Sequence, residues 1–303
     1  MRYLKTFLVA ALLLVGCTQK TTEPVKVLSP TGAPALSLLE AKVNESENSF
    51  DFVTGSEVLS AELVKEDSEY DVILAPVNLG AKMIQAGKSN YRLKAVITWG
   101  NLYLVGKSEN AMNEEGTFAT FGEGSVVDFV LKKAVDLSTI KPEITMYSSA
   151  QDVQGALLSG KADCGLLAEP AVTATIKKAK EQGIELQVIK NLQTSYKENM
   201  NTELEGFPQA AIFVKQGSED KVKDLLKTIE TFVNETALNT PDKIEEYVDN
   251  IGVDTLGVPS AALSKATWAK QNIRYVSATD CTEDLKTLLS AMKIEFTEDM
   301  LSK

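Results

Sequence analysis

Histidine is absent from the 303 residues of the chain. Triad-type serine and cysteine hydrolases use histidine as their general base, and histidine is a usual ligand of catalytic zinc. These enzyme classes and histidine metal sites are therefore excluded, and we expect neither a metal ion nor another cofactor. Arginine is almost as scarce, because only Arg92 and Arg274 follow Arg2. The chain thus has few of the forked side chains that bind carboxylates and sulfonates.

Long apolar runs are missing beyond the N-terminal segment, since no later stretch reaches the roughly 20 apolar residues of a transmembrane helix. The formal net charge is −11. An acidic surface repels phosphate backbones, so we expect no nucleic-acid partner. Cys164 lies in an apolar run that is typical of a buried thiol. A disulfide with Cys281 stays open, because spacing along the chain does not determine separation in space.

The N-terminal segment has the three features of a secretory signal peptide. Arg2 and Lys5 give it a positive start, and Phe7–Val15 forms an apolar run that is too short to span a bilayer. Small Gly16 then precedes Cys17. The four residues LVGC resemble the lipobox of bacterial lipoproteins, whose cleavage leaves a diacylated N-terminal cysteine. We therefore expect residues 1–16 to be a signal peptide and Cys17 to be lipidated.

The alternative is an ordinary signal peptide that is followed by a chance cysteine. Residues 17–24 are polar and lack hydrophobic periodicity, as a flexible tether between a lipid and a folded domain should. One acyl chain binds a membrane only marginally, so stable anchoring requires the diacyl form. The protein is expected to be extracytoplasmic and anchored by lipid to the cell membrane. It would then lie either in the periplasm or at the cell surface.

Short apolar runs alternate with helical patterns from residue 25 onward, which favours parallel strands with crossover helices. The expected strands are residues 25–28, 50–54, 70–75, 94–99, 102–106, 117–121, 144–147, 164–167, 186–189, 209–214 and 273–276. The expected helices are residues 35–42, 58–65, 78–86, 125–134, 151–159, 170–182, 218–239, 241–250, 259–271 and 282–292. The fold class is therefore α/β.

Two strand–helix series and a helical tail indicate two lobes. The extended segments Leu102–Gly106 and Gln209–Val214 are candidates for two crossing strands that form a hinge. This arrangement places residues 25–102 and 213–303 in the first lobe and residues 103–212 in the second. The alternative is a single doubly wound sheet.

Ligands of open α/β sheets bind at the carboxyl ends of the strands. Six loops at such ends are rich in small polar residues, and they place backbone N–H groups and hydroxyls at helix starts. The alternative is that these residues only cap their helices. The candidate ligand-binding residues of these loops are Thr31, Gly32, Ser56, Asn78, Glu123, Gly124, Ser125, Ser148, Ser149 and Glu169.

Three motifs in the second series carry a family resemblance. Gly160–Asp163 is a Gly-x-x-Asp turn after a helix, and the strand that follows it ends in Glu169–Pro170. Phe121–Ser125 is a glycine-serine loop before another helix. Together they resemble type II solute-binding proteins of ABC importers, in particular the nitrate, aliphatic-sulfonate and thiamine-pyrimidine-precursor group. The resemblance covers nearly all of the mature chain in element order.

This resemblance implies a two-lobed type II periplasmic binding protein fold. It also implies that the protein binds a ligand and does not catalyse a reaction. The implied protein is a monomeric lipoprotein that captures a small solute between its lobes and delivers it to an ABC permease and ATPase. Alternatives are an enzyme that uses the same fold on a small aromatic metabolite, and a surface adhesin or sensor without a transporter.

The ligand is expected to be neutral or cationic. Glu123 and Glu169 lie in the predicted cleft loops and would repel an anion such as nitrate or a sulfonate. Aromatic rings could form a flat wall, although core packing is the alternative for each of them. The rings in question are Trp99, Phe121, Tyr147 and Phe207. Together these residues favour a heteroaromatic solute such as a pyrimidine, with an anion as the alternative.

Overall fold

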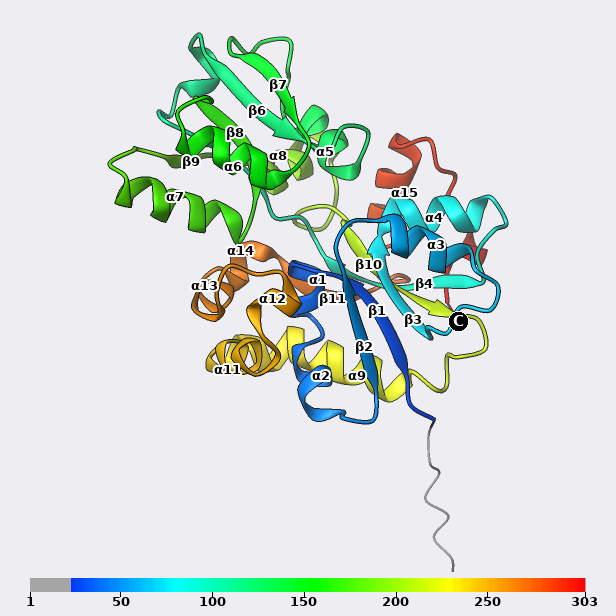
Figure 1. Cartoon of the computed structure of the whole chain (residues 1–303). Helices are drawn as coiled ribbons and strands as arrows, with labels where there is room; N and C mark the ends of the chain where they lie inside the picture. The colour runs from blue at the N-terminus through cyan, green and yellow to red at the C-terminus, as the bar shows by residue number, and fades with distance from the viewer. Residues whose placement is uncertain (1–22, 303) are drawn as a thin grey trace, which may run out of the picture.

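Two mixed β-sheets with helices packed against them form the described part of the chain, residues 23–302 of a computed structural model (Figure 1). The predicted signal peptide and Cys17 lie outside the described residues. None of the helices within residues 23–302 is both long and apolar enough to cross a membrane.

The first sheet has the strand order β11-β4-β10-β3-β1-β2. Strand β1 is parallel to β2 and β3, whereas β10 is antiparallel to β3 and β4, and β11 is antiparallel to β4. These strands are β1 (Lys26–Pro30), β2 (Ser49–Val53), β3 (Val72–Pro76), β4 (Tyr91–Thr98), β10 (Ala210–Lys215) and β11 (Ile273–Ser277).

The second sheet has the order β7-β6-β8-β5-β9. Strand β6 is parallel to β7 and β8, and β5 is antiparallel to β8 and β9. These strands are β5 (Leu102–Gly106), β6 (Thr117–Phe121), β7 (Glu143–Tyr147), β8 (Cys164–Ala168) and β9 (Gln187–Asn191).

The expectation of parallel strands is wrong at β5, β10 and β11, which run antiparallel to their neighbours. Strands β5 and β10 are the first strands that the chain forms after it passes from one sheet to the other. Each is entered from the edge where the parallel strands of its sheet end, so it has to run in the opposite direction. The segments that pass between the sheets are residues 99–101 and 201–209, just before the two strands expected to cross.

The helices cover both sheets and also form the tail (Figure 1). Helix α8 was not expected, because its sequence LQTSYKENM lacks an apolar period. The expected helix 35–42 is two short helices, α1 and α2, and the expected helix 259–271 is divided into α13 and α14. The α-helices are α1 (Ala33–Leu36), α2 (Leu39–Asn44), α3 (Glu57–Val64), α4 (Val77–Gln85), α5 (Val126–Ala134), α6 (Ala150–Leu158), α7 (Ala171–Glu181), α8 (Leu192–Met200), α9 (Lys223–Thr231), α10 (Ala237–Asn239), α11 (Asp242–Ile251), α12 (Val253–Leu256), α13 (Ala261–Ala266), α14 (Trp268–Gln271) and α15 (Thr282–Ala291). A π-helical turn, Phe232–Thr236, joins α9 to α10, and two short 3-10 helices are Ala111–Asn113 and Glu298–Met300.

One apolar core runs through the crossing between the sheets. Its buried side chains include Leu28 and Ile73 of the first sheet and Leu104 and Phe118 of the second. The packing is close, because a Cβ on Gly80 of α4 would lie 2.1 Å from a ring carbon of Phe213. The two sheets are therefore joined by shared burial as well as by the chain.

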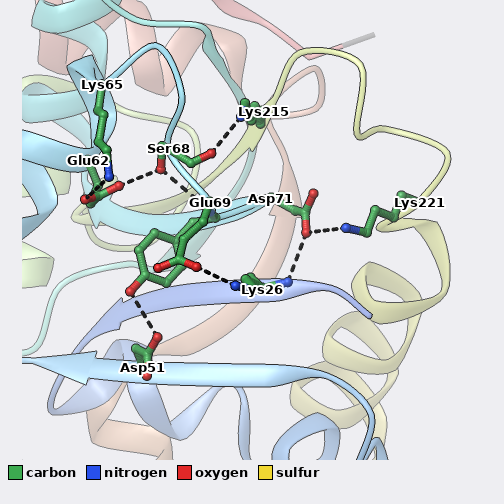
Figure 2. A network of polar contacts seen from close by, with 10 residues as sticks. Lys26, Asp51, Glu62, Lys65, Ser68, Glu69, Asp71, Lys215 and Lys221 are labelled. Carbon is green, nitrogen blue, oxygen red and sulfur yellow. Dashed lines mark hydrogen bonds and ion pairs between the residues drawn. The ribbon is translucent and has the colours of Figure 1, made fainter. Parts of the chain in front are cut away.

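Polar contacts hold the end of the first sheet where its parallel strands begin (Figure 2). Asp71 accepts hydrogen bonds from the backbone N–H of Lys26 (3.0 Å), from Ser218 (2.9 Å) and from the ammonium of Lys221 (2.8 Å). The buried carboxylate thus joins β1 and β3 to the segment that precedes α9. This network stabilises one end of the sheet. The loops that follow β1 and β3 lie at the opposite end.

Cys164 and Cys281 are both free and buried. They lie in different parts of the fold, in β8 of the second sheet and just before α15. Burial raises the pKa of each thiol to about 12. Burial therefore favours the protonated form of each thiol. The disulfide that the sequence left open is not formed, because both cysteines are free.

Candidate functional site

A cleft of about 640 Å³ opens between the two sheets. Pro30, Pro76 and Thr98, which end β1, β3 and β4, line its first side. Ala168, which ends β8, and the loop after β6 line the second side. The cleft therefore lies at the carboxyl ends of parallel strands in both sheets, where α/β folds bind ligands. Its volume suits a small molecule.

The two crossing segments, residues 99–101 and 201–209, contact each other directly. The backbone N–H of Phe207 donates to the carbonyl oxygen of Trp99 (3.1 Å), and the Asn272 side chain donates to the same oxygen (2.8 Å). Gly206 has φ +85°, and a Cβ there would lie only 1.9 Å from that oxygen. Gly100 has φ +84°, and its Cβ would lie 2.3 Å from the ring of Phe207. Only glycine fits at these two close approaches.

The first-sheet side presents neutral polar groups at helix starts. Thr31, Ser56 and Asn78 all line the cleft, as does Gly32. No side chain caps the helices that begin here, α1, α3 and α4. Ser56 precedes α3 with φ −113° and ψ −5°, whereas a capping residue needs an extended backbone. The serine hydroxyl therefore does not turn back onto its own helix.

The second-sheet side satisfies its helix starts with acceptors of its own. Ser125 lines the cleft with an extended backbone and accepts a hydrogen bond from the N–H of Val127 (3.2 Å). Asp128, which is buried, accepts from the N–H of Gly124 (3.0 Å) and pairs with Lys132 (2.8 Å). Both the hydroxyl and the carboxylate therefore occupy N–H groups at the start of α5.

Glu169 likewise accepts a hydrogen bond from an N–H group at the start of α7. This side chain lines the cleft and is only 2% exposed. Its carboxylate accepts from the N–H of Thr173 (3.1 Å) and from the hydroxyl of the same residue (2.8 Å). The ammonium of Lys270 on α14 lies 3.8 Å away. Burial, and then the negative charge of Glu169, raises the pKa of Tyr103.

The structure brings together most of the residues expected from the loops. The predicted residues that line the cleft are Thr31, Gly32, Ser56, Asn78, Glu123, Gly124, Ser125 and Glu169. Ser149 instead caps α6 and accepts from the N–H of Asp152 (3.2 Å), and Ser148 is exposed beside it. Neither serine lines the cleft.

The expected aromatic wall is absent from the cleft lining. Trp99 and Phe207 are fully buried in the core behind the cleft, where Phe207 packs on Tyr196 and Arg274 lies over Trp99. Phe121 and Tyr147 do not line the cleft either. Flat apolar surface comes instead from prolines. Those that line the cleft are Pro30, Pro34, Pro76 and Pro170.

Two amide side chains that the sequence did not single out also line the cleft, Asn101 and Gln209. Both lie in or beside the crossing segments, so the linear pattern of strand, loop and helix gave no signal for them. No lysine or arginine among the described residues lines the cleft, whereas Glu123 and Glu169 do. Within residues 23–302, no group of three or more histidine, cysteine or carboxylate side chains could hold a metal ion.

Neither the protein-family models nor the curated proteins match this sequence. Solved structures do match it in shape. A protein described as an ABC transporter from Parabacteroides distasonis has a TM-score of 0.77 at 17% identity, over 93% of this chain and 99% of that one. The periplasmic aliphatic sulphonate binding protein of Escherichia coli has a TM-score of 0.61 at 15% identity, over 93% and 89%. The fold is that of the type II periplasmic binding proteins.

A third structure with this periplasmic binding protein fold is the ligand binding component of an ABC-type import system from Staphylococcus aureus, determined with zinc bound. It has a TM-score of 0.62 at 14% identity, and the match covers 93% of this chain and 96% of that one. Identities this low establish the shared fold alone.

Proposed function

We propose that this protein is the substrate-binding lipoprotein of an ABC importer and captures a small neutral or cationic solute in the cleft between its sheets. The observation that carries the proposal is the cleft itself, about 640 Å³ in volume, lined from the carboxyl ends of strands in two sheets. Two lobes that are connected by two crossing segments can close around a bound solute and exclude water from it.

The charge of the cleft favours a solute without negative charge. Helix N-termini are the usual anion sites of α/β folds. On the second-sheet side, acceptors of the chain occupy N–H groups at the starts of α5 and α7, whereas α1, α3 and α4 on the first-sheet side begin without a side-chain cap. The carboxylates of Glu123 and Glu169 add repulsion for an anion. A nitrogen heterocycle such as a pyrimidine fits this environment, and the proline surfaces can pack against its ring.

Isothermal titration calorimetry with the purified protein tests the ligand class. We expect cytosine or a related pyrimidine to bind, and ethanesulfonate not to bind. Small-angle scattering with and without the bound compound tests closure, which should reduce the radius of gyration. Tight binding of the sulfonate and none of the pyrimidines would contradict the proposed ligand class, whereas no binding and no closure with either would contradict solute capture.

The proposed partners are a membrane, through lipid on Cys17, and the permease and ATPase of an ABC importer. We expect the binding protein to act as a monomer. Mass spectrometry of the N-terminal peptide checks the anchor, which should appear as a diacylglyceryl group on Cys17 with residues 1–16 removed. Co-purification with a permease and an ATPase after detergent extraction checks the transporter, and size-exclusion chromatography checks the monomer.

A further inference from the structure

Two charged residues line the cleft in the described part of the chain, and only one of them is buried. Glu169 is 2% exposed, whereas Glu123 is exposed to solvent. Water and dissolved salt screen an exposed charge, but they screen a buried charge much less. The net charge that a solute meets inside the cleft therefore depends mainly on how the carboxylate of Glu169 is balanced.

Both carboxylate oxygens of Glu169 already have partners within the chain. Oε2 accepts a hydrogen bond from the N–H of Thr173 (3.1 Å), and Oε1 accepts one from the hydroxyl of the same residue (2.8 Å). The ammonium of Lys270 lies 3.8 Å from Oε1, which is within ion-pair distance. A buried carboxylate without a counter-charge would attract a cation, whereas this one already has a counter-charge.

Lys270 approaches Glu169 from the other side of the molecule. It belongs to α14, whose Trp268 packs in the core of the first sheet, whereas Glu169 directly follows β8 of the second sheet. The hydroxyl of Tyr103 on β5 donates to the backbone oxygen of Lys270 (3.1 Å). This second contact keeps the end of α14 against the second sheet, so the position of Lys270 does not depend on the ion pair alone.

Lys270 balances this charge without taking any space in the cleft. It does not line the cleft, and 57% of its side chain is exposed. The side chains of the first-sheet side that a solute meets are neutral ones, among them Thr31, Ser56 and Asn78. A cation that enters such a cleft loses hydration and gains no unpaired buried counter-charge, which costs free energy. A neutral solute does not pay this cost.

We infer that Lys270 balances the charge of Glu169 from outside the cleft and thereby makes the cleft select neutral solutes over cationic ones. The substrate class is then uncharged polar compounds, of which a neutral pyrimidine is one. Lys270 acts through Glu169 and makes no contact with the solute. This inference rests on the proposed function and decides between the neutral and the cationic solute that it allows.

Matched probe pairs test the inference on the full protein. Benzamide is compared with benzamidine, and 4-aminopyrimidine with 4-aminopyridine. The members of each pair have nearly the same shape, but benzamidine and 4-aminopyridine are cations at neutral pH. Calorimetry should give an affinity for each neutral compound that is at least about five-fold higher than for its cationic partner. Equal or tighter binding of the cation in either pair would overturn the inference.

Variants of Lys270 assign the selectivity to its charge. Lys270→Met keeps the length of the side chain and leaves both hydrogen bonds between Thr173 and Glu169 in place. The ratio of the affinities for cation and neutral compound should rise about five-fold in each pair, because Glu169 then lacks its counter-charge. Lys270→Arg keeps the charge and should keep the ratio of the natural protein. A purely structural effect of Lys270→Met would weaken both members equally, and this outcome would refute the inference.

Lys265→Met is the matched control. It removes the same charge from the neighbouring helix α13, where Lys265 pairs with Asp242 (3.2 Å) and does not line the cleft. The ratio should stay unchanged in this variant. Glu169→Gln should lower the ratio, because it leaves Lys270 without its partner. A rise with Lys265→Met as large as with Lys270→Met would contradict the inference, since the overall charge of the tail would then account for the selectivity.

The same measurements separate this inference from the proposed function. Closure around the probes with a ratio that Lys270→Met does not change refutes the inference and leaves solute capture intact. Failure of all the probes, cytosine and ethanesulfonate included, to bind or to close the lobes refutes solute capture, and the inference with it.

Discussion

The two sides of the cleft begin their helices in opposite ways. On the second-sheet side, Ser125 and Ser149 have extended backbones and cap their helices, and Asp128 and Glu169 bind further N–H groups. On the first-sheet side, Ser56 has a helical backbone and caps nothing. One residue type thus behaves differently according to its φ and ψ, because capping requires the extended region. The side chains left available to a ligand are mainly those of the first sheet.

The largest expected effect on stability comes from disturbing the contact between the two crossing segments, which connect the two sides of the cleft. Gly206→Ala places a Cβ 1.9 Å from the Trp99 carbonyl oxygen, so the crossing has to shift. We expect a loss of about 3 kcal/mol in the free energy of unfolding, measured in urea. Gly183→Ala is the control, because Gly183 also has positive φ (+72°) but open space around it. It should cost only about 1 kcal/mol. Equal losses would show that backbone strain alone accounts for the effect.

Removing the acceptor at the start of α7 should make the second side resemble the first. Glu169→Ala frees the N–H of Thr173 and removes a carboxylate from the cleft. We expect a stability loss of about 1–2 kcal/mol, as for a lost cap, together with new stabilisation by sulfate or ethanesulfonate in a thermal melt.

Asp136→Ala provides the comparison for Glu169→Ala. Asp136 accepts from the N–H of Ser138 in an exposed turn that does not line the cleft. This variant should show no anion-dependent stabilisation. Anion stabilisation of both variants alike would mean that the N-terminus of α7 is not the site.

A smaller effect distinguishes the two kinds of serine directly. Ser149→Ala removes a cap from α6 and should cost about 1 kcal/mol in urea unfolding. Ser56→Ala makes the same chemical change at the start of α3 and should cost about 0.3 kcal/mol or less, because no capping bond is lost. A comparable loss at both positions would contradict the backbone explanation of the difference between the two sides.

The smallest effect concerns pH and the turn that ends in Asp163. A hydrogen bond from Lys107, followed by one from the N–H of Thr117, lowers the pKa of Asp163. A lowered folded-state pKa gives stability that is present above the ordinary aspartate pKa, and this stability is lost as pH falls through the folded value. The carboxylate is partly exposed, so the expected gain over Asp163→Asn is about 0.5 kcal/mol or less at pH 7.

Urea midpoints measured between pH 3 and 7 check this prediction. The gap between the natural protein and the Asp163→Asn variant should narrow below about pH 4. A gap that stays constant over this range would mean that the ionised carboxylate contributes nothing.

Local rules placed most of the predicted loop residues at the cleft, but they failed for Ser148 and Ser149 and gave no signal at the crossing. Thr31, Ser56, Asn78 and Glu169 follow strands in the sequence, and the rule that ligands bind at carboxyl ends brought them together. Trp99 was wrongly placed in the cleft, because its ring is buried under Arg274 and its backbone oxygen accepts from Asn272, and both residues lie far along the chain. The linear order of the chain could not predict these contacts.

Helix α8 and the two amides of the cleft escaped prediction for related reasons. Helix α8 buries Gln193 and Ser195 together with Leu192 and Tyr196, so its buried face does not appear as a hydrophobic period in the sequence. Asn101 and Gln209 line the cleft only because two distant crossing segments meet there. The direction of β5 and β10 likewise follows from where the chain enters each sheet.

The interleaved strand order of the first sheet constrains how the chain can assemble during synthesis. Strand β10 is inserted between β3 and β4, and β11 forms the edge beyond β4, so this sheet stays incomplete until residue 277 has been made. The second sheet uses only residues 102–191, which emerge as one continuous stretch. A nascent chain can therefore complete the second sheet first. The first sheet has to wait for its central strand β10, which is made later.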